Sequence, residues 1–146
     1  IFKNNKKSIF TETWYQFPEN LVKDKNLDDW KNILKIRGLV NKKIEELREK
    51  GMVGSSLQSV IEIGAPSQIY NSLNEFIEDL KFIFISSKVN IKKNEKLEVN
   101  VYKSEHQKCE RCWHYCEDVG LDESHKELCG RCIKNLYEDG EIRLYA

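Results

Sequence analysis

Four cysteines stand in two pairs with the spacing of metal-binding knuckles. Cys109 and Cys112 form one C-x-x-C pair, Cys129 and Cys132 form the other, and 16 residues separate the pairs. Structural zinc takes four ligands in a tetrahedron, and soft thiolates suit it. A gap of this length is typical of paired knuckles on one ion. The spacing predicts one structural Zn²⁺ ion bound by these four cysteines, with iron in the same all-sulfur cage as an alternative.

Other candidate ligands lie near the two pairs. Cys116, His106, His114 and His125 are close in sequence to the knuckles. Four cysteines already complete the tetrahedron, so we expect these four residues to be loop residues beside the site. No coordination position remains for water, which makes the zinc structural rather than catalytic. The ion would stabilise a unit of roughly 40 residues that is too small to fold well alone.

The distribution of cysteines indicates a reducing compartment. All five cysteines lie between Cys109 and Cys132, and the first 108 residues contain none. A disulfide framework would cross-link the whole of a small secreted chain, and an odd count leaves one thiol unpaired. No apolar run approaches the ~18–20 residues that span a bilayer, and no signal-peptide pattern is evident. We expect a cytoplasmic protein with no membrane contact.

Charge excludes a general polyanion binder. The chain has 24 basic and 24 acidic side chains, so its formal net charge is zero. Residues 106–134 hold five basic and six acidic side chains, and four thiolates with one Zn²⁺ add about two negative charges. Any nucleic-acid contact must therefore come from particular side chains rather than from a positive surface.

Arg111 and Trp113 are candidates for such a contact. Arg111 lies inside the first knuckle and Trp113 directly follows it. A guanidinium and an indole on a rigid turn suit stacking and edge recognition of unpaired RNA bases. Alternatively, Trp113 packs over the zinc site and Arg111 offsets its negative charge. The first interpretation predicts that both side chains are exposed on one surface, and the second predicts a buried Trp113.

Hydrophobic spacing predicts the elements that position these residues. A helix is expected over 27–50, with Gly51 as its stop. Its apolar residues are Leu27, Trp30, Ile33, Leu34, Ile36, Val40, Ile44 and Leu47. Alternating residues predict a strand over 56–63, and helical spacing predicts a second helix from Ser67 to Leu80.

Two further strands are expected before the knuckles. The apolar run 82–85 predicts a buried strand, the polar, lysine-rich segment 87–95 predicts a turn, and alternation over 97–102 predicts another strand. The chain is thus an α+β protein with an N-terminal helical segment, a small strand–helix–strand–strand unit and a C-terminal four-cysteine zinc-knuckle module. The expected domains are 1–52, 53–104 and 105–146.

The knuckles and their flanks resemble the C-terminal zinc-binding module of bacterial isoleucyl-tRNA synthetases. The resemblance extends upstream to the end of the helical anticodon-binding domain of that family and to the helix that follows, so it covers nearly the whole chain. The segment 88–104 matches least well. The matching features are Lys-Cys-Glu-Arg-Cys-Trp-His-Tyr (108–115), Glu-Asp-Val-Gly (117–120), Leu-Cys-Gly-Arg-Cys (128–132), Gly-Glu-Ile-Arg-Leu-Tyr-Ala (140–146), Ser-Ile-Phe (8–10) with Glu12 and Trp14, the helix residues Arg37, Val40, Lys42, Ile44, Glu45 and Arg48, and Gly-Ser-Ser-Leu (54–57).

The resemblance implies a class Ia synthetase that joins isoleucine to its tRNA with ATP. The family's H-x-G-H and K-M-S-K-S signatures and its editing domain are absent from the chain. We therefore expect no catalytic residues here, with ATP and Mg²⁺ confined to a catalytic domain outside the chain. Residue 1 is Ile and the only methionine is Met52, so we expect an excised piece of a larger enzyme, ending at its natural C-terminus. The implied partners are the anticodon loop of isoleucine-accepting tRNA and the remainder of the same synthetase chain, in a monomer.

The resemblance also implies roles for individual residues. In the family, the Arg and Trp of the first knuckle lie against the anticodon, which corresponds to Arg111 and Trp113 here. Lys108, Arg131 and Lys134 are candidates for phosphate contacts, with solvated surface as the alternative for each.

Two other classes of function remain open. A related zinc knuckle occurs in DNA glycosylases of the formamidopyrimidine type, where an Arg enters duplex DNA, but their N-terminal Pro-Glu nucleophile and helix–two-turn–helix are not evident here. The third class is a zinc-stabilised module that only packs against the rest of its own enzyme, and it predicts a buried Trp113.

Overall fold

Helix α1, Lys25–Glu49, is the first described element and matches the helix predicted over 27–50. This computed structural model describes residues 25–141, so the features predicted within 1–24 and 142–146 lie outside the described residues. Ile33, Ile36, Val40 and Ile44 form the buried face of α1, whereas Trp30 and Leu34 are 37% and 55% exposed.

Gly51 ends α1 as predicted. Its φ of +67° lies in the left-handed region, which a residue without a Cβ adopts readily. The Gly51 N–H donates to the Arg48 carbonyl and the Met52 N–H to the Leu47 carbonyl, both at 2.9 Å. These bonds satisfy carbonyls that the helix end would otherwise leave unpaired.

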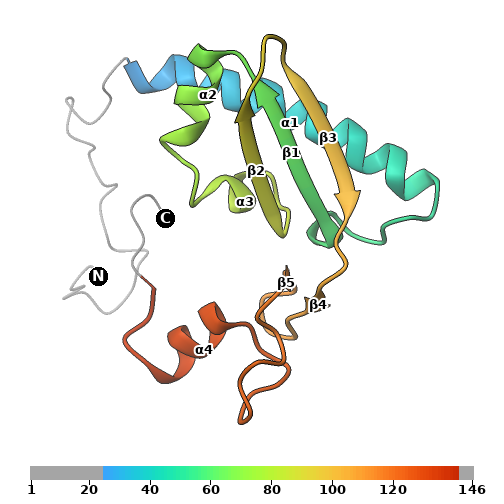
Figure 1. The fold of residues 1–146 in the computed structure, drawn as a ribbon, viewed down its shortest axis with the longest axis vertical. Coiled ribbons are helices and arrows are strands. Elements are labelled where there is room, and N and C mark those ends of the chain that lie inside the picture. Colours follow the sequence, from blue (N-terminus) through green and yellow to red (C-terminus); the bar gives the residue numbers. More distant parts are fainter. Residues whose placement is uncertain (1–24, 142–146) are drawn as a thin grey trace, which may run out of the picture.

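Three strands form a mixed sheet in the order β2–β1–β3 (Figure 1). A 3₁₀ turn, η2 (Ser56–Gln58), precedes β1 (Ser59–Ala65), so the strand predicted over 56–63 starts later and ends later than expected. β2 (Lys88–Lys93) runs parallel to β1, and β3 (Glu98–Lys103) runs antiparallel to it. The strand predicted over 97–102 is confirmed as β3.

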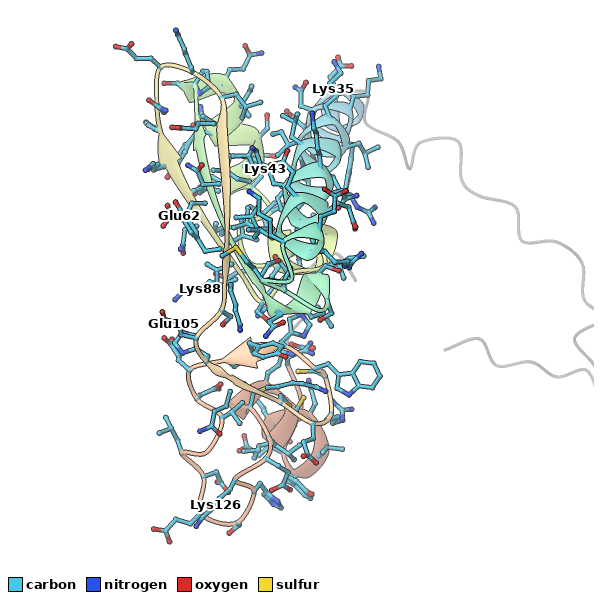
Figure 2. All side chains as sticks on the ribbon, turned by 90° about the vertical axis from the view of Figure 1, so that its right-hand side faces the viewer. Lys35, Lys43, Glu62, Lys88, Glu105 and Lys126 are labelled. Atoms are coloured by element: carbon cyan, nitrogen blue, oxygen red, sulfur yellow. The ribbon has the colours of Figure 1, made fainter. Side chains whose placement is uncertain are left out.

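The sheet carries its apolar residues in two rows on one face. The register aligns Val89, Ile61 and Val101 in one row and Ile91, Ile63 and Val99 in the other. Helices α1, α2 (Ser67–Asn74) and α3 (Leu80–Ile83) share one core with these rows. Figure 2 shows α1 lying along one side of the sheet. The α+β class is confirmed, and one core spans the predicted domain boundary near residue 52.

The second predicted helix is shorter than expected. α2 ends at Asn74, and turns connect it to the single-turn helix α3, which starts at Leu80. Leu73, Phe76 and Leu80 are buried, whereas Ile77 is 37% exposed.

The prediction of a buried strand over 82–85 is wrong. Residues 80–83 form α3, and the Phe84 N–H donates to the Leu80 carbonyl at 2.9 Å in a helical bond. Only Phe84 of the run is fully buried, and Phe82 and Ile85 are 38% and 45% exposed. A short apolar run does not distinguish a strand from one helical turn, because it carries no periodicity.

The prediction of a turn over 87–95 is also wrong, because residues 88–93 form strand β2. β2 is an edge strand, so one side of its backbone pairs with β1 while its lysines face solvent. Charged residues, lysine above all, protect edge strands from pairing with other chains. The order strand–helix–strand–strand is nevertheless correct, with its second strand six residues later than predicted.

The knuckle region follows β3 as a separate small core. It contains a two-stranded ribbon of β4 (Gln107–Lys108) and β5 (Tyr115–Cys116), followed by helix α4 (Gly130–Tyr137). Its buried residues are Cys109, Val119, Leu128, Cys129 and Cys132. We call residues 25–103 the sheet unit and residues 105–141 the zinc module. Figure 1 shows the zinc module below the end of the sheet. Over residues 25–141, no helix combines the length and apolarity needed to cross a membrane.

Candidate metal centre

The four knuckle cysteines converge on one point in the zinc module. The sulfur atoms of Cys109, Cys112, Cys129 and Cys132 all lie within 4.8 Å of one another, and within residues 25–141 no other group of three or more potential ligands does so. Three of the four residues are buried and Cys112 is half-buried. Four soft donors from two turns fit the closed tetrahedron of a structural zinc ion. The chemistry of the donor set thus agrees with the metal predicted from the spacing.

A tight turn holds the first knuckle. The Cys109 N–H donates to the His114 carbonyl at 2.8 Å, and the Trp113 N–H donates to the Cys109 carbonyl at 2.9 Å. Trp113 has a φ of +65°, a left-handed conformation that is uncommon for a residue with a Cβ. Such conformations persist where the surroundings fix them, and they gather at functional sites.

The second knuckle lies at the start of α4. Cys129 is the N-cap of this helix, and its N–H donates to the Cys109 sulfur at 3.4 Å, which joins the two knuckles. The Gly130 N–H donates to Asp118 Oδ2 at 2.8 Å. A Cβ on Gly130 would lie 2.8 Å from the same oxygen, so only glycine permits this approach.

The thiols differ in how readily they ionise before zinc binds. Burial opposes ionisation of Cys109, but backbone N–H groups of Cys112, Cys129 and Arg111 donate to its sulfur and lower its pKa to about 6. Burial raises the pKa of Cys112 and of Cys129. Ionisation of Cys109 is therefore favoured near neutral pH, whereas zinc must displace the protons of Cys112 and Cys129.

The remaining candidate ligands lie outside the sulfur cluster. Cys116 is half-buried beside it, and burial raises the pKa of its thiol to about 11. The His114 Nδ1 lies 3.2 Å from the Cys112 carbonyl, and burial lowers the pKa of its imidazole. The His125 ring stacks on Tyr137 at 4.2 Å between centroids. None of these three residues, nor His106, belongs to the four-sulfur cluster.

Arg111 and Trp113 are both exposed on the first knuckle. Trp113 is 59% exposed, and its Nε1–H donates to the Glu110 carbonyl at 3.0 Å, which fixes the indole ring. Lys108 Nζ lies 5.2 Å from the centre of that ring. Arg111 is exposed, and its Nη1 lies 3.5 Å from the Cys132 sulfur. The knuckle thus exposes an indole with Lys108 over it, and the exposed Arg111 offsets the charge of the thiolates.

Arg131 has a different environment from Arg111. Its side chain is 23% exposed, and its Nη1 donates to Glu141 Oε1 at 3.1 Å. Its guanidinium also lies over the Phe82 ring, 5.0 Å from the centroid. Lys134, the other basic candidate on α4, is exposed.

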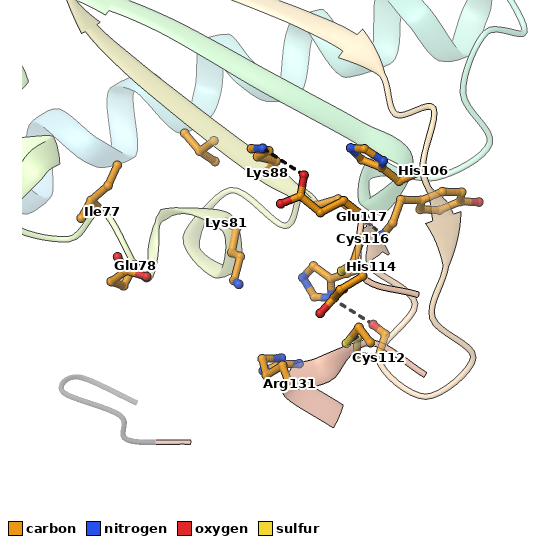
Figure 3. A pocket seen from close by; sticks show the side chains of 15 residues that line it. Ile77, Glu78, Lys81, Lys88, His106, Cys112, His114, Cys116, Glu117 and Arg131 are labelled. Atoms are coloured by element: carbon orange, nitrogen blue, oxygen red, sulfur yellow. Dashed lines mark hydrogen bonds and ion pairs between the residues drawn. The ribbon is translucent and has the colours of Figure 1, made fainter. Parts of the chain in front are cut away.

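A cavity of about 330 Å³ is lined by residues on both sides of the junction between the sheet unit and the zinc module (Figure 3). Lys81, Lys88 and Arg131 line it together with Glu78 and Glu117, and Lys88 Nζ lies 4.0 Å from a Glu117 oxygen. Charges of both signs surround this space, so it favours neither an anion nor a cation.

Comparison with known proteins identifies the knuckles and their surroundings. Residues 107–135 match the family described as "Zinc finger found in FPG and IleRS". The chain is 44% identical to the isoleucine–tRNA ligases of Burkholderia multivorans and Burkholderia cenocepacia, and 43% identical to that of Burkholderia ambifaria. Each match covers 98% of this chain and 15% of the ligase. The chain therefore spans about 15% of the length of these curated relatives.

Proposed function

The chain is homologous along 98% of its length to isoleucine–tRNA ligases, and we propose that it forms the zinc-binding part of such a ligase that contacts the anticodon loop of isoleucine-accepting tRNA. The whole ligase would attach isoleucine to this tRNA with ATP and Mg²⁺, which act in a catalytic part outside the chain. We assign no catalytic residue here, and we propose a cytoplasmic, monomeric parent. The division into 1–52, 53–104 and 105–146 stays a prediction.

The exposed Trp113 is the single observation that carries the anticodon role. An aromatic side chain that is 59% exposed, and whose ring is fixed by a hydrogen bond, is available for stacking at little entropic cost. Unpaired loop bases are what proteins read in RNA, because their faces and edges are free. Lys108 beside the indole, and Arg111 on the same knuckle, would add hydrogen bonds and attraction to phosphate.

Two alternatives fit these observations less well. A module that only packs against its own enzyme predicts that Trp113 is buried in the parent ligase; in this part of the ligase the residue is 59% exposed. The matched zinc-finger family includes formamidopyrimidine-type glycosylases, but the relatives that cover 98% of the chain are isoleucine–tRNA ligases. Arg131 as an RNA contact also stays a prediction, because Glu141 and Phe82 already engage its guanidinium.

The proposal is tested by titrating the zinc-loaded chain with the anticodon stem-loop of isoleucine tRNA and following indole N–H signals by NMR. Binding should be weak, because most of the contact surface of a ligase is missing, and it should shift the Trp113 signal. The Trp30 signal is the internal control, because this indole packs on Phe76 in the sheet unit, with ring centroids 5.2 Å apart. A stem-loop with a different anticodon is the second control, and it tests whether binding depends on the anticodon sequence. Equal shifts with both RNAs, or no shift at Trp113, would refute the proposal.

A further inference from the structure

The hydroxyl of Ser87 joins the sheet unit to the zinc module. Ser87 Oγ donates to the Leu57 carbonyl before β1 and accepts the Tyr115 N–H of β5 at 2.6 Å. The Ser87 N–H donates to the Ser59 carbonyl at 3.0 Å. One buried side chain thus bonds segments that are 30 and 28 residues away in sequence. The bond to Leu57 fixes the hydroxyl within the sheet unit, and the bond from Tyr115 connects it to the zinc module.

A strained turn places Ser87 at this position. Ile85 follows α3 with a φ of +53°, a conformation that is an outlier for a β-branched residue. The Ser86 N–H donates to the Lys81 carbonyl at 2.9 Å and closes the helix end. Ile85 is 45% exposed, so packing of its own side chain does not account for the conformation. Strain of this kind persists where neighbouring contacts over-determine the backbone, and the bonds of Ser87 are such contacts.

Phe82 adds an aromatic contact beside the junction. Its ring meets the His114 ring edge-on, with centroids 5.7 Å apart, and Arg131 lies over it at 5.0 Å. Both partners belong to the zinc module, and His114 directly precedes Tyr115. The Lys88–Glu117 pair also crosses between the units, but its side chains are 51% and 73% exposed and their charged atoms are 4.0 Å apart. Exposed pairs contribute little, so the contacts of Ser87 and Phe82 count for more than this ion pair.

We propose that Ser87 is a positioning residue that sets the orientation of the zinc module on the sheet unit. Tyr115 pairs with Lys108 in the β4–β5 ribbon, and the turn between them carries Arg111 and Trp113. Rotation at the Ser87–Tyr115 bond therefore tilts the whole first knuckle. A ligase must hold one tRNA at its catalytic part and at its anticodon together, so this angle matters for charging. The effect on charging rests on the proposed function, whereas the positioning role of Ser87 does not.

The orientation is tested in the chain without RNA. In Ser87→Ala we expect amide exchange at Tyr115 to accelerate by about tenfold, and residual dipolar couplings to show a changed or averaged angle between the two units. Zinc content should stay at one ion per chain. Ser86→Ala is the matched control, because the Ser86 hydroxyl is buried with no hydrogen-bond partner in the described part of the chain. The proposal would be overturned if Ser87→Ala has the same residual dipolar couplings and the same amide exchange at Tyr115 as wild type.

A second variant keeps the test informative if Ser87→Ala unfolds. Phe82→Leu removes the ring contact and leaves the hydroxyl intact, and Phe82 is 38% exposed, so its loss does not open the core. We expect the same change in couplings at unaltered zinc content. A rigid wild-type angle in Phe82→Leu, together with an unfolded Ser87→Ala, would mean that Ser87 maintains the fold and does not position the module.

The functional consequence is tested in the parent ligase. Ser87→Ala should raise the KM for tRNA about three- to tenfold, while the stem-loop still binds the variant chain as it binds wild type. Ser87→Thr retains the hydroxyl and should restore charging. If stem-loop binding is absent from the wild-type chain, the proposed function fails while the coupling data still decide the role of Ser87. An unchanged KM with altered couplings would refute the link between orientation and charging.

Discussion

Replacing one zinc ligand, Cys132→Ser, should unfold the zinc module and spare the sheet unit. The module has five buried core residues, and only Val119 and Leu128 among them are not ligands. Burying two such side chains contributes about 3–6 kcal/mol. Zinc binding contributes about 10–16 kcal/mol in small zinc domains, so the ion dominates the stability of the module. The sheet unit has a separate core of twelve buried residues and does not depend on the ion.

The assay is an amide NMR spectrum with zinc measured by elemental analysis. Wild type should contain about one zinc per chain, and Cys132→Ser should lose it together with the dispersed signals of residues 105–141. Signals of α1 and β1–β3 should remain. Cys116→Ser is the matched control, because Cys116 lies in the same module but outside the four-sulfur cluster. The reasoning is refuted if Cys132→Ser keeps its zinc and its spectrum, or if Cys116→Ser loses both.

Two further predictions concern the same centre. Burial raises the pKa of Cys112 and of Cys129, so zinc must displace both protons near neutral pH. These two protons alone make the affinity for zinc fall by at least about 100-fold for each unit by which the pH falls. Chelator competition at pH 6 and pH 8 measures this, and equal affinities would contradict it. Gly130→Ala should destabilise the module by about 1–3 kcal/mol, because its Cβ would displace the Asp118 oxygen that accepts the Gly130 N–H. Gly130→Ala should still contain one zinc per chain but should lose it to a chelator faster than wild type does. A transfer rate equal to that of wild type would contradict the prediction.

The metal centre could be predicted from sequence because its determinants are local. Two residues between each pair of cysteines define a turn, and the convergence of four sulfurs follows from the demand of one ion for four ligands. The helix over 27–50 and the strand β3 were predictable for a similar reason: each repeats its apolar residues over enough turns or pleats to define one period.

The errors occurred where tertiary contacts decide the structure. The run 82–85 is too short to show a period, and its place beside the zinc module selects a helical turn. Strand β2 is lysine-rich because it lies at an edge, a position that its own residues do not reveal. Ser87 is an ordinary serine in sequence, and it gains its role only because residues 57 and 115 meet around it.

The central claim is that a zinc-held knuckle presents Trp113 to the anticodon of isoleucine tRNA. It is tested most directly by Trp113→Ala in the full ligase, with tRNA charging and isoleucine-dependent ATP–pyrophosphate exchange measured on the same preparation. Loss of one stacked base predicts that charging falls about 5- to 150-fold in kcat/KM, with exchange unchanged because adenylate formation needs no anticodon contact. Trp113→Phe keeps an aromatic ring and should lose less. Equal loss of both activities, or full charging by Trp113→Ala, would contradict the account.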